Sequence, residues 1–70
     1  MNKPRLFQYA IIWHPTEKQI KDEGAKSKVL IELTTILALD ERSAAMSAAM
    51  KIPQEYQNQL DQLEIPVKVF

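Results

Sequence analysis

The 70-residue sequence contains no cysteine, only one glycine and only one histidine. A chain without cysteine forms no disulfide, so a small scaffold held together by disulfides is excluded. A phosphate-binding loop needs several glycines, and a metal site needs histidine, cysteine or carboxylate side chains at suitable spacing. The sequence offers neither pattern. We therefore expect no catalytic residues, no metal site and no cofactor.

An excess of charge of one sign is also missing. Nine lysine and arginine residues balance nine aspartate and glutamate residues, so the formal net charge is zero. Lysine is frequent over residues 18–28, but Asp22 and Glu23 lie in that stretch and Glu17 directly precedes it. This mixture predicts no binding to nucleic acid or to an anionic membrane, although nucleic-acid binding through residues 18–28 is kept as a third hypothesis. No apolar run approaches the roughly 20 residues that a membrane-spanning helix needs.

The sequence does contain an apolar N-terminal segment typical of a central strand. Residues 6–13 are rich in aromatic and β-branched side chains and stop before Pro15. Both alternating faces are mostly apolar, and such a strand lies in the middle of a sheet or is covered on both sides. His14 follows the strand, where it is either exposed or caps a carbonyl. The odd positions carry the larger side chains, Phe7, Tyr9, Ile11 and Trp13.

A polar segment and a second strand come next. Residues 15–27 are charged and show no apolar period, which predicts a mobile connecting loop. Residues 28–39 predict an unusually long strand whose odd positions are largely apolar. The pair Thr34-Thr35 in its middle is a favourable place for a bend or bulge.

Two helical segments follow the second strand. Asp40 is expected to cap a helix over residues 41–51, because its carboxylate can accept from the first free N–H groups. Pro53 ends that helix, since the residue before a proline is driven out of the helical region. Residues 54–63 predict a short helical turn that docks its three apolar side chains, Tyr56, Leu60 and Leu63.

The last segment, residues 64–70, predicts a strand at a sheet edge, because Pro66 has no N–H for a ladder. The whole order predicts a single α+β domain over residues 1–70 with the succession β-β-α-β. We expect a three-stranded antiparallel sheet of order 2-1-3, with one helix packed on one face and a right-handed crossover.

One short helix covers only one face of such a sheet. The covered face is expected to hold the bulkier side chains, which are Phe7, Tyr9, Ile11, Trp13, Ile31, Leu33 and Leu37. The other face would be an apolar patch, and such a patch usually marks an interface. Alternatively, residues 15–27 or 54–63 fold over it, and a free sheet edge offers a second binding route by strand addition. The predicted interface residues are Leu6, Ala10, Ile12, Leu30, Ile36 and Phe70.

Three stretches of the sequence resemble small uncharacterised proteins of tailed bacteriophages. They are Leu6–Pro15, Thr34–Glu41 and Ile52–Phe70, which together cover most of the chain outside the polar segment. The resemblance brings no functional residues with it. It implies a phage gene product that is made in bacterial cytoplasm and incorporated into the virion.

The apolar face and this resemblance together predict a non-enzymatic protein-binding module. We expect a virion component, such as a capsid-associated or decoration protein, located in the virion or in the host bacterial cytoplasm. Its partner would be a capsid or other virion protein, or a second copy of the chain. The alternative is a small phage protein that binds and modulates a host enzyme or defence factor.

Overall fold

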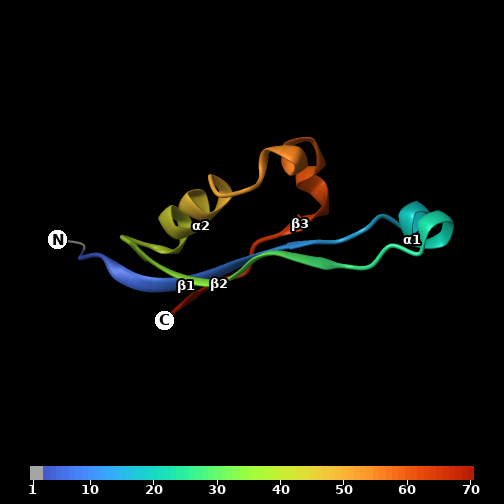
Figure 1. Cartoon of the computed structure of the whole chain (residues 1–70). Coiled ribbons are helices and arrows are strands. Elements are labelled where there is room, and N and C mark those ends of the chain that lie inside the picture. The colour runs from blue at the N-terminus through green and yellow to red at the C-terminus, as the bar shows by residue number, and fades with distance from the viewer. Residues whose placement is uncertain (1–2) are drawn as a thin grey trace.

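A single antiparallel sheet organises the chain in the computed structural model, which describes residues 3–70 (Figure 1). Residues 1 and 2 of the predicted domain lie outside the described part. The elements are β1 (Arg5–Trp13), α1 (Glu17–Glu23), β2 (Lys28–Ala38), α2 (Glu41–Ala49), the 3₁₀ segment η1 (Gln54–Gln62), β3 (Leu63–Glu64) and β4 (Val67–Val69).

The central position of β1 is confirmed. It pairs antiparallel with β2 on one side and with β3 and β4 on the other. The α+β class and the predicted strand order are therefore correct. The predicted last strand is divided into β3 and β4, with Ile65 and Pro66 between them. Pro66 contributes only its carbonyl, which accepts the N–H of Ala10 at 3.3 Å.

The described residues hold three helical segments: α2 and η1 lie in the two predicted helical stretches, and α1 lies inside the predicted loop of residues 15–27. A capping box starts α1: the Thr16 hydroxyl accepts the N–H of Gln19, and the Gln19 side chain accepts the N–H of Thr16. Gly24 ends it in the left-handed conformation, with φ of 64°. No residue of α1 is buried, which is why no apolar period announced it.

The shape follows from where these helices lie. The β1–β2 hairpin carries α1 at its far end, while α2 and η1 both lie over the same side of the sheet (Figure 1). The molecule is accordingly elongated, measuring 52 × 20 × 15 Å along its principal axes.

The predicted cap of α2 is confirmed. The carboxylate of Asp40 accepts the N–H of Ser43 at 2.7 Å, and α2 ends at Ala49, two residues before the predicted end. Hydrogen bonds from the backbone and side chain of Ser43 hold the pKa of Asp40 below its usual value of 3.8. The charged form of this side chain is therefore favoured in the folded chain.

The cap makes stability depend on pH in a defined direction. Folding lowers the pKa of Asp40, so the ionised Asp40 side chain adds to the free energy of unfolding above pH 3.8. This stabilisation is lost as the pH falls through the lower pKa of the folded state. Asp40→Ala is expected to lower the melting temperature at pH 7. The difference between Asp40→Ala and the original chain should shrink as the pH is lowered from 4 towards 2. Thermal melts across this range check it, and a difference that stays constant would contradict the cap.

The core lies between the sheet and the helices α2 and η1. From β1 the odd positions point into it, as predicted, and two alanines of α2 with no exposed surface meet them there. Alanine at these positions lets the helix lie close to the sheet. Side chains from β2 and the C-terminal segment complete the layer. The buried set is Phe7, Tyr9, Ile11, Trp13, Ala38, Ala44, Ala48 and Ile52.

The predicted face of the second strand is wrong over its second half. Ile36 lies opposite the buried Phe7 and packs against the core, whereas Leu33 and Leu37 are 59% and 67% exposed. Antiparallel pairing in this register matches odd residues of β1 with even residues of β2, so the even side chains of β2 face the helices.

Two register shifts then change the alternation along β2. From the pair Tyr9–Thr34 to the pair Ile11–Ile31, β1 advances by two residues and β2 by three. From there to the pair Ile12–Val29, β1 advances by one residue and β2 by two. These are β-bulges, each adding one residue to β2. They return Ile31 to the core, as predicted, and Leu30 also packs against the core.

Candidate protein-binding face

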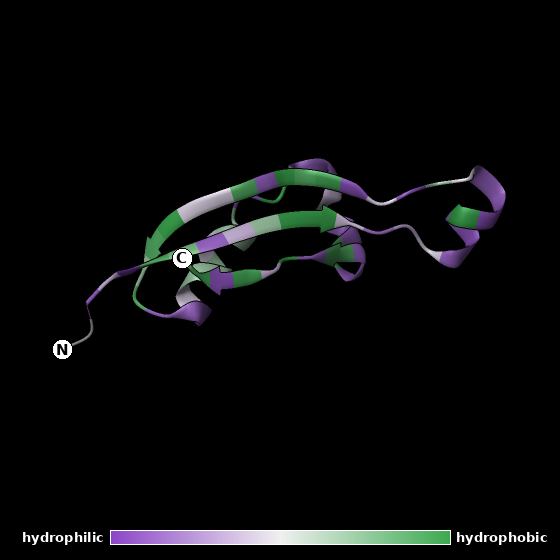
Figure 2. Cartoon of the chain, turned by 90° about the horizontal axis from the view of Figure 1, so that it is seen from below, coloured by the Kyte–Doolittle hydropathy of each residue, from purple (hydrophilic) through white to green (hydrophobic). Residues whose placement is uncertain are grey.

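The side of the sheet away from α2 and η1 carries apolar side chains, with three polar side chains between them. We call it the open face. Its members on β1 alternate with the buried residues of that strand. Its members on β2 and β4 include Leu37, which pairs with Leu6, and Thr35 and Lys68, which pair with Gln8. Figure 2 shows the molecule from below, with hydrophobic segments along β1 and β2. The open face consists of Leu6, Gln8, Ala10, Leu33, Thr35, Leu37, Lys68 and Phe70.

The pairing fixes how these side chains are arranged. Leu6 lies directly opposite Leu37, and the N–H of Phe70 donates to the carbonyl of Leu6 at 2.9 Å. One end of the open face is therefore a cluster of three large apolar side chains from three segments. Leu6 is 43% exposed and Phe70 is 69% exposed. With Leu33 and Leu37 they place four large apolar side chains in water on one face.

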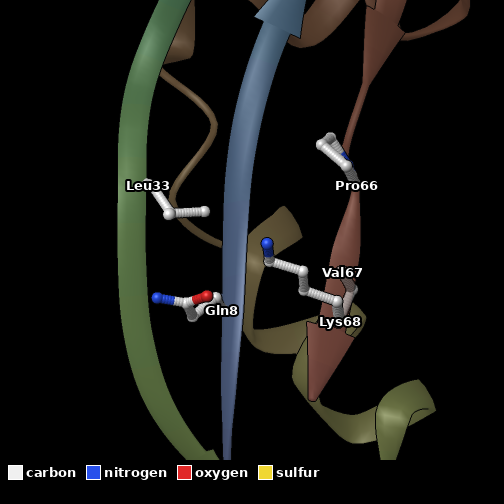
Figure 3. Close-up of a pocket in the computed structure, with 5 residues that line it drawn as sticks. All are labelled: Gln8, Leu33, Pro66, Val67 and Lys68. Atoms are coloured by element: carbon white, nitrogen blue, oxygen red, sulfur yellow. The ribbon is translucent and has the colours of Figure 1, made fainter. Parts of the chain in front are cut away.

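A shallow pocket of about 240 Å³ lies in the middle of the open face. Figure 3 shows the Leu33 and Gln8 side chains on one side of β1 and Pro66, Val67 and Lys68 along the segment on the other side. Its lining combines apolar walls with the amide of Gln8 and the ammonium group of Lys68. A partner's apolar side chain could enter it while a carbonyl or carboxylate beside that side chain accepts from Gln8 or Lys68.

The predicted interface residues divide into two groups. Leu6, Ala10 and Phe70 lie on the open face, and half-buried Ile12 follows them on the same side of β1 by alternation. Leu30 and Ile36 do not join them, since both pack against the core. Sequence reasoning missed Leu33, Leu37 and the pocket. The only signal was the proposed bulge near Thr34, which did not reveal the register.

A second polar arrangement, the neck cluster, closes the base of the hairpin that carries α1. The ring of His14 is hydrogen-bonded on both sides, with Nδ1 at 2.8 Å from Ser27 Oγ and Nε2 at 2.8 Å from Glu64 Oε1. The side-chain amide of Gln62 donates to the carbonyl of His14 at 3.0 Å and to Gln19 Oε1 at 2.8 Å. Side chains from α1, η1, β3 and the ends of the hairpin strands therefore meet at one place.

The neck cluster was also missed, because its members are up to 50 residues apart in sequence. A hydroxyl, an imidazole and a carboxylate bonded in series are the groups of a hydrolytic triad. In this chain the His14 and Glu64 side chains are 46% and 57% exposed. Water competes with hydrogen bonds at such exposure, so each contributes about 1 kcal/mol or less to stability. These hydrogen bonds join segments that are distant in the sequence.

Within residues 3–70 no three histidine, cysteine, aspartate or glutamate side chains gather in a way that could hold a metal ion. The helices of the described part are too short or too polar to cross a membrane.

Comparisons with family models, with curated proteins and with solved structures found no match. The function of the chain must therefore be inferred from its own residues and their geometry.

Proposed function

We propose that the chain is a non-enzymatic protein-binding module that docks through its open face, as a capsid-associated or decoration component of a bacteriophage virion. The observation that carries the binding role is the exposure of Leu6, Leu33, Leu37 and Phe70 together on one face. Several large apolar side chains exposed on one face of a small chain usually mark a protein interface. The virion context comes from the resemblance of the sequence to small phage proteins.

The charges of the chain favour this mode of binding over an electrostatic one. The formal net charge is zero, so no long-range field attracts a strongly charged partner. Binding would rest on burial of apolar side chains, which contributes roughly 25 cal/mol per Å². Lys68 and Gln8 beside the pocket would set the orientation of the partner.

Two measurements test the proposal. Mass spectrometry of purified virions of the phage that encodes the chain should detect it. In a sedimentation assay with those particles after removal of the chain, Leu33→Glu/Leu37→Glu should bind at least about tenfold more weakly than the original chain, because two carboxylates would be buried at the interface.

A matched control uses two exposed methionines, one in α2 and one at its C-terminal cap. Met46 and Met50 are 63% and 85% exposed on the other side of the molecule. Met46→Glu/Met50→Glu adds the same charge and should bind like the original chain. Absence from virions would refute the virion role, and soluble capture of a host enzyme would favour the alternative. Equal binding by both double variants would refute the open face.

The neck cluster supplies a direct test of the non-enzymatic part. We expect the chain to hydrolyse p-nitrophenyl acetate no faster than its Ser27→Ala variant. Ser27 and His14 are exposed, and their hydrogen bond is proposed only to join two segments. The rates are compared at equal protein concentration between pH 6 and 9. A rate that is lost in both Ser27→Ala and His14→Ala would show instead that the cluster is a nucleophilic site.

A further inference from the structure

The two edges of the sheet are unequally protected against pairing with another strand. On one edge lie β3 and β4, which are two and three residues long and separated by Pro66. Short strands and proline are common devices that prevent edge pairing. The other edge is β2, an 11-residue strand, and no strand of residues 3–70 pairs with its outer side. In Figure 2 β2 runs along the outside of the sheet.

Protection of the β2 edge is confined to its first half. Lys28, Glu32 and the two bulges lie there. The second half, Leu33–Ala38, contains no charge, no proline and no glycine. It also pairs regularly with β1 from Thr34 onwards, so no bulge interrupts the outer edge of this part of the strand. An uncharged, regular and exposed edge of this kind is a ready template for another strand.

We propose that this edge pairs antiparallel with the same edge of a second copy of the chain, with Thr35 opposite Thr35 of that copy. The two copies would be related by a twofold axis through this pair, perpendicular to the sheet. Their sheets would join into one, with α2 of both copies on the same side.

The side chains single out this register. Centred on Thr35, it places Leu33 opposite Leu37 of the second copy, twice by symmetry, and Glu32 opposite Ala38. A threonine pair and two leucine pairs are favourable cross-strand neighbours. Both leucines lie on the open face, where they are more than half exposed in the single chain.

Neighbouring registers fit less well. Centring on Ile36 would place Glu32 opposite Asp40 of the second copy, and like charges directly opposite destabilise a ladder. Centring on Thr34 would place Leu37 opposite Ile31, which the bulges have turned towards the core. The zero net charge removes any long-range repulsion between two copies.

The pairing uses the edge of β2, whereas the proposed function uses the face of the sheet. Either can therefore be wrong while the other holds. In the joined sheet the two open faces lie on the same side, so both remain accessible to a larger partner.

The absence of cysteine makes the register directly testable by a single substitution. Residues directly opposite in an antiparallel pair have Cβ atoms about 5 Å apart, close to the separation that a disulfide needs. Thr35→Cys should therefore form a covalent dimer under mild oxidation, at least about tenfold faster than Ser47→Cys, whose thiol would be exposed on α2. Non-reducing electrophoresis measures both.

Light scattering on the original chain completes the test. The expected mass at about 100 μM is twice the 8.1 kDa of one chain. Thr35→Lys should return it to the mass of one chain, because two ammonium groups would meet at the axis. A monomeric mass would overturn the proposal. Equal crosslinking rates of Thr35→Cys and Ser47→Cys would also overturn it. This holds even if the original chain is a dimer, because the dimer would then pair elsewhere.

Discussion

Ile11→Glu is expected to unfold the chain. The Ile11 side chain has no exposed surface and lies in the core with Tyr9, Ala48 and Ile52. A carboxylate there would lose its water without gaining a partner, at a cost of several kcal/mol. That cost matches or exceeds the whole stability of a small domain, about 5 kcal/mol. Far-ultraviolet circular dichroism and thermal melting should show loss of the cooperative transition.

Leu33→Glu is the matched control for this substitution. Leu33 belongs to the neighbouring strand, is also large and aliphatic, and is 59% exposed on the open face. Its carboxylate would stay in water, so the variant should melt within a few degrees of the original chain. If Leu33→Glu unfolded the chain as completely as Ile11→Glu, the assignment of the two sheet faces would be wrong.

Trp13→Ala is expected to lower the free energy of unfolding by about 3–5 kcal/mol. Trp13 is 6% exposed, and its side chain contacts two other segments, η1 and β2. Its ring packs 6.4 Å from that of Tyr56 in η1, and its Nε1–H donates to Gln59 Oε1 at 2.9 Å. The Lys28 ammonium lies 5.3 Å from its ring centroid. The substitution thus removes the side chain that joins η1 to the sheet. Urea denaturation followed by circular dichroism measures the loss.

Two further variants separate the contributions at this position. Trp13→Phe keeps much of the aromatic packing and removes the hydrogen bond, so it should cost less than Trp13→Ala. Gln59→Ala removes only the acceptor and leaves the indole N–H without its partner, which costs about 1–3 kcal/mol. A loss below about 1 kcal/mol for Trp13→Ala would contradict the central place given to the indole.

The central strand and the helix cap could be predicted because each follows from a local rule. Residues 6–13 are apolar on both faces, and only the middle of this sheet accommodates such a strand. Asp40 before an alanine-rich run predicts a helix start without any knowledge of the remaining structure. By contrast, α1 depends on a capping box and a terminal glycine around seven residues of which six are polar, so a search for apolar periodicity overlooks it.

The candidate face was only partly predictable, for a reason specific to β2. Its odd positions are the more apolar, but leucine and isoleucine occur on both faces. Hydrophobicity alone therefore favours the odd face, which is wrong over the second half of the strand. The choice depends on register, and a slip of one residue exchanges the two faces. Here the pairing of Phe7 with Ile36 and the two bulges decide it. The neck cluster depends on contacts between residues distant in sequence, which no local pattern contains.

The position of α1 at the far end of the hairpin has a consequence for the order in which the structure opens. This helix buries no residue, and the hydrogen bonds at the neck are its link to the rest of the molecule. Its backbone amides should therefore exchange with deuterium through small local openings. The amides of β1, paired on both sides beneath α2, should exchange only when the whole chain unfolds. Hydrogen exchange would thus divide this small domain into a labile tip and a slowly exchanging body.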